Sequence, residues 1–213
     1  MRDGRVSGVD RALLPLRVAN VLLRRDRGAW RHLVPWLSSL RPGVDPLELG
    51  TPWLAFGAIE WLQDNLRSRW RVLELGSGGS TLYFRRRVRH LVSVEHDPSW
   101  YRRVTQRVPP GPGYEPLLVP EDAFGQVIER YPEGWFDLVL VDGGADRVAA
   151  LLAAAPRVAR GGFLILDNSD HRDTEARLRP LDGLWRRDFY GVAPWNLHRG
   201  RLHLQRTTVW RAE

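Results

Sequence analysis

The stretch 71–81, Arg-Val-Leu-Glu-Leu-Gly-Ser-Gly-Gly-Ser-Thr, constrains the fold of this chain more than any other segment. It begins as a short apolar run, typical of a buried strand, and then breaks into a glycine-rich turn at 76–79. Ser80 and Thr81 follow as capping residues of a helix that continues to Val88. Strand, glycine turn and helix together predict a ligand site, because glycine lets a ligand approach the backbone and the free N–H groups at the helix start face it.

The glycine turn departs from the fingerprint of dinucleotide-binding proteins. That fingerprint, G-x-G-x-x-G, needs a glycine at position 81, which here is Thr81. Glu74 stands two residues before Gly76, where its carboxylate would repel a pyrophosphate. The turn therefore predicts a ligand that carries a positive charge and no phosphate, and it weighs against an NAD-dependent oxidoreductase.

Composition removes several classes of enzyme. The chain has 213 residues and no cysteine, and its 32 basic residues are all arginine. Disulfides, thiolate metal sites and cysteine nucleophiles are therefore excluded, as are Schiff-base and P-loop lysines. The net charge of +7 favours an anionic partner only weakly, since a GC-rich coding bias is the better explanation of the arginine content.

The length suits one main domain, expected at 51–213, behind an N-terminal helical extension at 1–50. No apolar run approaches the roughly 18 residues that cross a bilayer. The N-terminus also lacks the apolar core of a signal peptide. We therefore expect no transmembrane segment and a cytoplasmic location.

Apolar residues recur at helical spacing over 10–23 and again over 29–40. We expect these helices to pack over the main domain or to form a homodimer contact, and binding to a membrane or another partner is the alternative. Thr51 as N-cap and Pro52 as first helical residue predict that the next helix starts there. Trp53 and Trp61 in this helix are candidates for bordering a substrate.

Short apolar runs alternate with helical stretches along the rest of the chain. Strands are expected at 71–75, 91–95, 117–119, 136–142 and 163–167, followed by two late strands at 185–191 and 202–211. The alternation predicts right-handed βαβ units and a mainly parallel sheet, and the late strands predict an antiparallel pair. An acidic residue stands at or after the end of each of the first five strands: Glu74, Glu95, Asp122, Asp142 and Asp167. Ligands bind at that edge of such sheets.

Three segments together resemble the motifs of class I methyltransferases that depend on S-adenosyl-L-methionine (SAM), close to bacterial small-molecule enzymes. They are Val-Leu-Glu-Leu-Gly-Ser-Gly at 72–78, Ser-Val-Glu-His-Asp at 93–97 and Leu-Asp-Asn-Ser-Asp at 166–170. The resemblance extends over about 51–211. It implies a Rossmann-like α/β fold: a seven-stranded, mainly parallel sheet with helices on both faces and an antiparallel C-terminal strand pair.

The resemblance also implies which residues bind SAM. Glu95, nineteen residues after Gly76, is placed to accept hydrogen bonds from both ribose hydroxyls. His96 is a candidate for contact with the adenine, and Asp122, with Ala123, for bonding the adenine amino group. Asp122 is compatible with a helix N-cap as well. The remaining SAM-binding candidates are Glu74, Gly76, Ser77, Gly78, Ser80, Thr81 and Asp142.

Asp142, Asp167 and Asn168 match the residues that bind magnesium in cation-dependent catechol-type O-methyltransferases. Mg²⁺ is therefore a candidate cofactor, which in such enzymes lowers the pKa of a substrate hydroxyl. The chain departs from that family at Ala145, where the catalytic lysine would stand. The alternative is that Asp142 contacts the methionine end of SAM, while Asn168 and Asp170 order the loop.

Methyl transfer requires orientation of the acceptor and, for a hydroxyl, a base. The candidate catalytic residues are Asp142, Asp170 and His171. We expect a SAM-dependent methyltransferase that acts on a small-molecule acceptor, at oxygen. A nucleic-acid methyltransferase is disfavoured because the chain lacks an Asn/Asp-Pro-Pro-aromatic motif and a cysteine. A non-catalytic SAM-binding protein is the alternative from another class.

Overall fold

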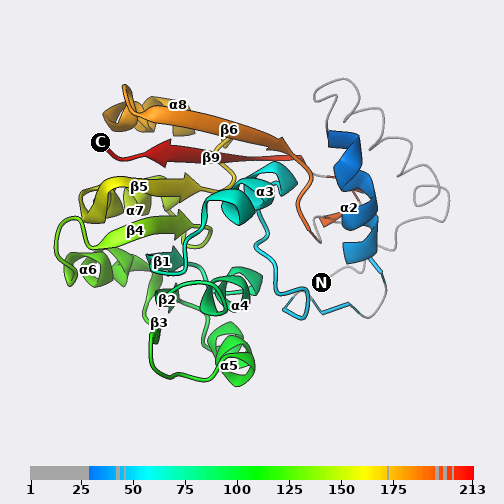
Figure 1. Cartoon of the computed structure of the whole chain (residues 1–213), viewed down its shortest axis with the longest axis horizontal. Helices are drawn as coiled ribbons and strands as arrows, with labels where there is room; N and C mark the ends of the chain where they lie inside the picture. Colours follow the sequence, from blue (N-terminus) through cyan, green and yellow to red (C-terminus); the bar gives the residue numbers. More distant parts are fainter. Residues whose placement is uncertain are drawn as a thin grey trace.

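The computed structural model describes residues 29–41, 44–45, 47–171, 173–194, 197–198, 201–202 and 204–213. Their architecture is a seven-stranded sheet with the strand order β3-β2-β1-β4-β5-β9-β6 (Figure 1). In chain order the strands of this sheet are β1 (Arg71–Leu75), β2 (His90–Glu95), β3 (Tyr114–Leu118), β4 (Phe136–Val141), β5 (Val158–Leu166), β6 (Trp185–Gly191) and β9 (Gln205–Arg211). A separate short hairpin joins β7 (Leu197–His198) and β8 (Arg201–Leu202).

Strands β1 to β5 pair in parallel, and β9 runs antiparallel between β5 and β6. The predicted fold class is therefore confirmed, including the antiparallel pair at the C-terminal end. Because β6 runs in the same direction as β5, the carboxyl ends of six strands meet at one edge of the sheet. This edge holds the glycine turn and most of the acidic residues that the sequence singled out.

Helices cover both faces of the sheet (Figure 1). The described helices are η1 (Ala29–His32), α2 (Leu33–Ser39), α3 (Phe56–Asn65), α4 (Gly79–Arg85), α5 (Pro98–Arg107), η2 (Glu121–Ala123), α6 (Phe124–Glu129), α7 (Arg147–Ala154), η3 (Ala155–Arg157), α8 (Thr174–Arg177) and η4 (Arg179–Leu181). Helices α3, α4 and α5 pack on one face, and α6, α7 and the segment 174–181 pack on the other. Alternation along β4 serves both cores, with Leu138 and Leu140 on the first face and Val139 and Val141 on the second.

The predicted helix start at Thr51 is wrong. Helix α3 begins at Phe56, because the preceding segment makes tertiary hydrogen bonds instead of helical ones. Ala55 N donates to Thr207 Oγ1 at 3.0 Å, and Gln205 Nε2 donates to the carbonyl of Trp53 at 2.8 Å. By contrast, Asp97 caps α5, since its side chain accepts hydrogen bonds from the backbone amides of Ser99 and Trp100.

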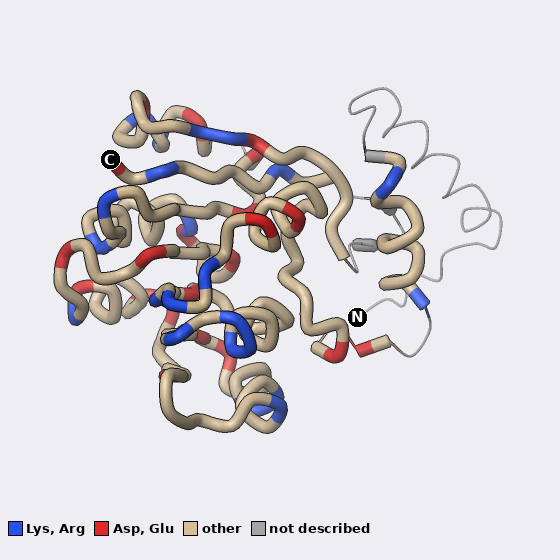
Figure 2. Tube along the Cα trace, in the orientation of Figure 1, with Lys and Arg blue, Asp and Glu red and all other residues tan. Residues whose placement is uncertain are grey.

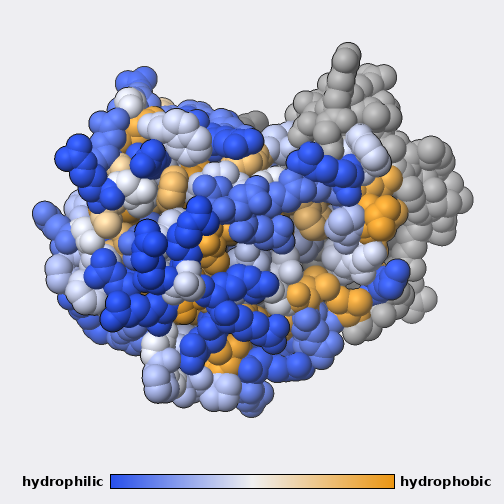
Figure 3. Space-filling view, viewed as in Figure 1, coloured by the Kyte–Doolittle hydropathy of each residue, from blue (hydrophilic) through white to orange (hydrophobic). Residues whose placement is uncertain are grey.

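The predicted helix at 29–40 is present as η1 followed by α2. Trp36 is fully buried against Val192, whereas Trp30, Val34 and Leu37 are exposed. Figure 3 shows apolar residues at the surface over α2. The predicted helix at 10–23 lies outside the described residues, so the N-terminal extension and the homodimer contact stay predictions. No helix within the described ranges combines the length and the apolarity needed to cross a bilayer.

Two glycines bring the ends of β1 and β4 into backbone contact. A Cβ atom on Gly76 would lie 2.6 Å from the amide nitrogen of Gly143, and one on Gly143 would lie 2.6 Å from the Cα of Gly76. Gly76 also has a φ of +98°, which side-chain-bearing residues rarely adopt. The carbonyl of Leu75 accepts hydrogen bonds from Asp142 N and Gly143 N, at 2.9 and 2.7 Å. This contact places the glycine turn beside the loop after β4.

Gly76→Ala is expected to lower the free energy of unfolding by about 2–3 kcal/mol, because the new methyl group clashes with backbone that has no room to move. Urea unfolding at constant pH measures this change. The matched control is Gly125→Ala in α6, where an added Cβ meets nothing within 4 Å. Since alanine favours helix, the control is expected to leave stability unchanged or to raise it by up to about 1 kcal/mol. Equal stability of the two variants would contradict the proposed clash.

Candidate active site

The glycine turn and the end of β2 are joined by Glu95, which is almost fully buried. Its Oε2 accepts hydrogen bonds from Ser77 N at 3.1 Å and from Ser77 Oγ at 2.9 Å. Its Oε1 accepts from the backbone amides of His96 and Asp97, at 2.8 and 2.9 Å. The carboxylate is thus fixed at the mouth of the turn. A diol bound there would compete with Ser77 for Oε2.

Glu74 lies beneath the turn and is completely buried. Its Oε2 accepts hydrogen bonds from Thr81 Oγ1 and Ser93 Oγ, both at 2.6 Å, and Thr81 Oγ1 also accepts from Gly78 N at 2.9 Å. Its Oε1 has no hydrogen-bond partner within the described part of the chain. Glu74 therefore braces the turn from below, and Ser80 and Thr81 are buried beside it.

Burial raises the pKa of Glu74 to about 7. The hydroxyls of Ser80, Ser93 and Thr81 act in the opposite direction, and the charge of Glu95 adds to the rise. The carboxyl group is consequently close to half protonated at neutral pH. Its predicted contact with a cationic ligand stays a prediction.

Phe124 lies near both His96 and Asp122. The imidazole of His96 meets the Phe124 ring edge-on, with ring centroids 6.2 Å apart. Phe124 and Asp122 line a cavity of about 400 Å³ that continues along α7. Asp122 is exposed and Ala123 half-buried, both within η2. Asp122 makes no capping hydrogen bond.

The ends of β4 and β5 hold two carboxylates with a guanidinium between them. Arg147 Nη1 lies 3.2 Å from Asp142 Oδ1 and 3.8 Å from Asp167 Oδ2. The same nitrogen donates to the carbonyl oxygen of Asp167 at 3.3 Å. Burial and the charge of the neighbouring acid raise the pKa of Asp142 well above its ordinary value. Burial raises that of Asp167 to about 6, against the effects of Thr207, Arg147 and Gln205.

Asp167 is buried and its oxygen atoms are already engaged. Oδ1 accepts from Thr207 Oγ1 at 2.6 Å, and Gln205 Nε2 lies 2.9 Å from both oxygens. Asn168, which has a φ of +55°, turns its amide back to donate to Oδ2. The predicted magnesium site is therefore not supported. Throughout the described ranges, no group of three His, Cys, Asp or Glu side chains is suited to hold a metal ion.

A cavity of about 380 Å³ opens beside these carboxylates, on the α7 side. Asp167, Asn168, Arg147 and His171 line it, whereas Asp142 and Asp170 do not. Asp170 and His171 are both exposed. The sheet edge thus brings Asp142, Asp167, Asn168 and His171 together, and it leaves Asp170 outside the cavity.

Sequence reasoning missed four contributors to this site. Trp100 Nε1 donates to the carbonyl of Ser77 at 2.7 Å, and its ring lies 6.0 Å from that of Trp53. Gln205 and Thr207 reach Asp167 from β9, across the sheet, and no local pattern points to them. Arg147 could have been noticed from the sequence, because a cation in the first turn of a helix interacts unfavourably with the helix dipole.

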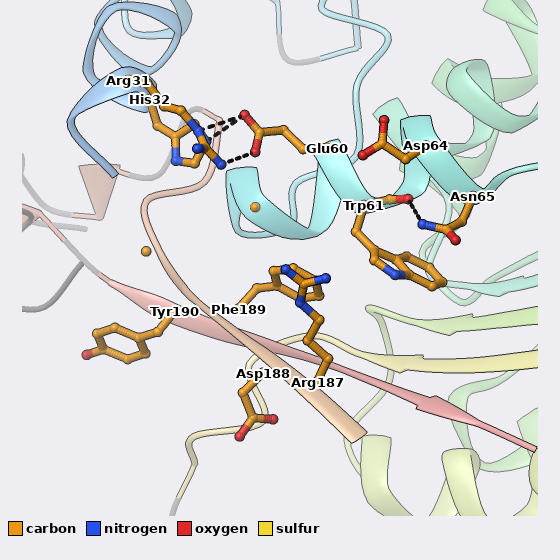
Figure 4. A pocket seen from close by; sticks show the side chains of 12 residues that line it. Arg31, His32, Glu60, Trp61, Asp64, Asn65, Arg187, Asp188, Phe189 and Tyr190 are labelled. Carbon is orange, nitrogen blue, oxygen red and sulfur yellow. Dashed lines mark hydrogen bonds and ion pairs between the residues drawn. The ribbon is translucent and has the colours of Figure 1, made fainter. Parts of the chain in front are cut away.

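A further cavity, of about 570 Å³, lies between η1, α3 and β6 (Figure 4). Glu60 is paired there with Arg31 at 2.5 Å and with His32 at 2.9 Å. Trp61, which the sequence singled out as a possible substrate contact, lines this cavity and packs edge-on against Phe163. None of the candidate SAM-binding residues lines it.

Comparison with known proteins shows which domain and which solved structures this chain resembles. A family model described as a methyltransferase domain matches residues 73–169, from β1 to just beyond β5. No curated protein matches the sequence of the chain. Among solved structures, precorrin 8W decarboxylase from Methanobacterium thermoautotrophicum is 18% identical with a TM-score of 0.54, and the match covers 81% of this chain and 93% of that chain.

Two other solved structures share the fold. The N-methyltransferase NodS from Bradyrhizobium japonicum WM9 is 12% identical with a TM-score of 0.51, over 79% of this chain and 97% of that chain. An rRNA methylase from Streptococcus thermophilus is 13% identical with a TM-score of 0.52, over 81% and 100%. The matched domain, the sheet order and the shared fold support a class I SAM-dependent methyltransferase. The resemblance to catechol-type enzymes is not confirmed.

The raised pKa of Glu74 predicts a pH-dependent stability. Between pH 4.5 and about 7 the folded chain binds more protons at Glu74 than the unfolded chain does. The free energy of unfolding therefore falls as pH rises through this window. Glu74→Gln, which cannot ionise, is expected to flatten this fall.

Urea unfolding at steps between pH 4.5 and 7 measures this slope in both proteins. Asp142 and Asp167 contribute in the same direction in each, so the difference between the proteins isolates Glu74. The control is Glu129→Gln, on an exposed position of α6, which is expected to keep the parent slope. A Glu74→Gln protein with an unaltered slope would contradict the prediction.

Proposed function

We propose that this methyltransferase acts at an oxygen atom of a small-molecule acceptor. The observation that carries the proposal is the carboxylate pair Asp142–Asp167, which lies at the strand ends beside a cavity of about 380 Å³. A cavity of this size suits a small molecule. Its lining of Asp167, Asn168, Arg147 and His171 suits a polar acceptor.

When bound, SAM supplies a sulfonium-activated methyl carbon, which the acceptor oxygen attacks as the carbon–sulfur bond breaks, leaving S-adenosylhomocysteine and a proton. The task of the chain is to orient the acceptor and to take up that proton. Asp142 and Asp167 lie in one network, so we assign the proton to the pair and not to either acid alone. At neutral pH, a pKa of about 6 leaves Asp167 largely ionised, which gives the pair a negative charge. His171, exposed on the cavity wall, is the candidate for passing the proton to solvent.

We assign the cofactor to the edge formed by the turn, β2 and η2. Glu95 would hold the ribose, in exchange for its present bonds to Ser77. His96 and Phe124 would lie against the adenine, and Asp122 with Ala123 would hydrogen-bond its amino group. Gly76 and Gly78 keep the turn free of side chains there.

A nucleic-acid acceptor is the alternative, since the chain carries a net charge of +7. Figure 2 shows arginines and acidic residues interspersed along the described elements instead of gathered on one of them. Several arginines are also neutralised in ion pairs, such as Arg186 with Glu175 at 2.7 Å and Arg177 with Asp146 at 2.7 Å. Salt-dependent retention on RNA or DNA, together with methylation of it, would favour this alternative.

Glu95→Gln is expected to weaken SAM binding by about 10- to 100-fold, because one charge-assisted hydrogen-bond acceptor is lost. Calorimetry with SAM and S-adenosylhomocysteine measures this change, and NAD serves as a ligand that should not bind. Glu129→Gln carries the same change of charge on an exposed face of α6 and is expected to keep the parent affinity. If the parent protein bound neither sulfur compound, the proposed cofactor site would be refuted.

Asp142→Asn is expected to lower kcat by roughly 10²-fold or more on a hydroxyl acceptor found by screening, because the proton acceptor is impaired. In the parent protein kcat/KM should rise with pH through about 6, as the carboxylate pair loses its proton. Asp182→Asn, at an exposed loop position, is the control. Formation of S-adenosylhomocysteine is the readout. Transfer only to amines or nucleic acid would contradict the choice of oxygen.

A further inference from the structure

Arg147 occupies a position that helix formation does not explain. It is the first residue of α7, directly after the capping residue Asp146. The N-terminal end of a helix carries partial positive charge, so a cation there is unfavourable. The compensating charges lie outside the helix, at the ends of β4 and β5.

The guanidinium of Arg147 lies between the carboxylates at these two strand ends. Nη1 is 3.2 Å from Asp142 and 3.8 Å from Asp167. A divalent cation at this point would meet a fixed positive charge and a carboxylate whose oxygens already accept hydrogen bonds from Thr207, Gln205 and Asn168. Magnesium requires near-octahedral oxygen ligation. The residues present therefore do not fit a divalent metal.

Most of the donor capacity of Arg147 remains unused by the protein. A guanidinium has five N–H donors. Only Nη1 makes hydrogen bonds or ion pairs with the described residues. The side chain is about 30% exposed and lines the cavity together with Asn168 and His171. The remaining donors, on Nε and Nη2, are thus free to serve a molecule in that cavity.

We propose that Arg147 is the resident cation of this site, in the place of a divalent metal, and that its free N–H donors bind the acidic hydroxyl oxygen of the acceptor. The second half rests on the proposed function. A fixed positive charge beside a hydroxyl favours its ionised form and so lowers its pKa. The proton passes to the carboxylate pair, and the oxyanion stays bound to the guanidinium. Arg147 would thereby perform the task that the metal performs in cation-dependent O-methyltransferases.

The first experiment titrates Mn²⁺ alone and follows the free ion by electron paramagnetic resonance. The parent protein is expected to bind no Mn²⁺ at this site. Arg147→Gln should gain at least about tenfold in affinity, because two facing carboxylates lose their cation. Arg147→Lys, which keeps the charge, should not gain. Arg102→Gln, on an exposed face of α5, controls for the change in net charge.

Two results of this titration would overturn the first half of the proposal. One is Mn²⁺ binding to the parent protein that Asp142→Asn abolishes. The other is a folded Arg147→Gln protein that gains no affinity. Circular dichroism and unfolding curves show whether each variant is folded.

The second experiment uses 4-nitrophenol, whose phenolate absorbs visible light, with protein saturated by S-adenosylhomocysteine. The parent protein should bind the phenolate and lower the apparent pKa of the probe. Arg147→Gln should lose at least about tenfold in affinity for the phenolate, and Arg147→Lys should retain part of it, since lysine lacks the planar fork. Equal binding and equal ionisation of the probe in parent and Arg147→Gln would overturn the second half.

The two failures are distinguishable. Binding of S-adenosylhomocysteine depends on the turn, β2 and η2, and it tests the proposed function without reference to Arg147. Suppose that the protein binds this compound, and that binding and ionisation of 4-nitrophenol are the same in the parent and in Arg147→Gln. The proposed function then stands, and only the second half of the inference is refuted.

Discussion

The close approach of Gly76 to Gly143 is the constraint on which the rest of the site depends. No side chain fits between them, since a Cβ on either residue would lie 2.6 Å from backbone atoms of the other. The contact fixes the turn after β1 against the loop after β4. It thereby fixes the distance between Glu74 and Glu95, at the ends of β1 and β2, and the carboxylates that follow β4 and β5.

Buried carboxyl groups connect the layers of this edge. Glu74 joins β1, β2 and the start of α4 through the hydroxyls of Thr81 and Ser93. Asp167 joins β5 to β9 through Gln205 and Thr207, and Gln205 reaches on to the segment before α3. Burial of these acids is unfavourable for their charged forms, which is why their pKa values rise.

Local patterns were sufficient for much of the fold. Alternating apolar runs and helices predicted the parallel sheet and its antiparallel C-terminal pair. They failed at Thr51, where hydrogen bonds from β9 hold the chain out of a helix. The candidate site was predicted in part: the acids at the strand ends do gather at one edge, but Glu74 and Asp167 are enclosed by protein donors.

The sequence by itself determined the class of fold and the edge of the sheet that carries the candidate site. Apolar runs, glycine turns and strand ends are local features, so they can be recognised from short segments of the chain. Only the tertiary structure decided what each acid faces. Residues distant in sequence make that decision: Gln205 and Thr207 saturate Asp167, and Arg147 supplies the positive charge that the motif alone assigned to a metal. Such partners are set by the pairing of β5 with β9 and by the position of α7, and no spacing along the chain encodes them.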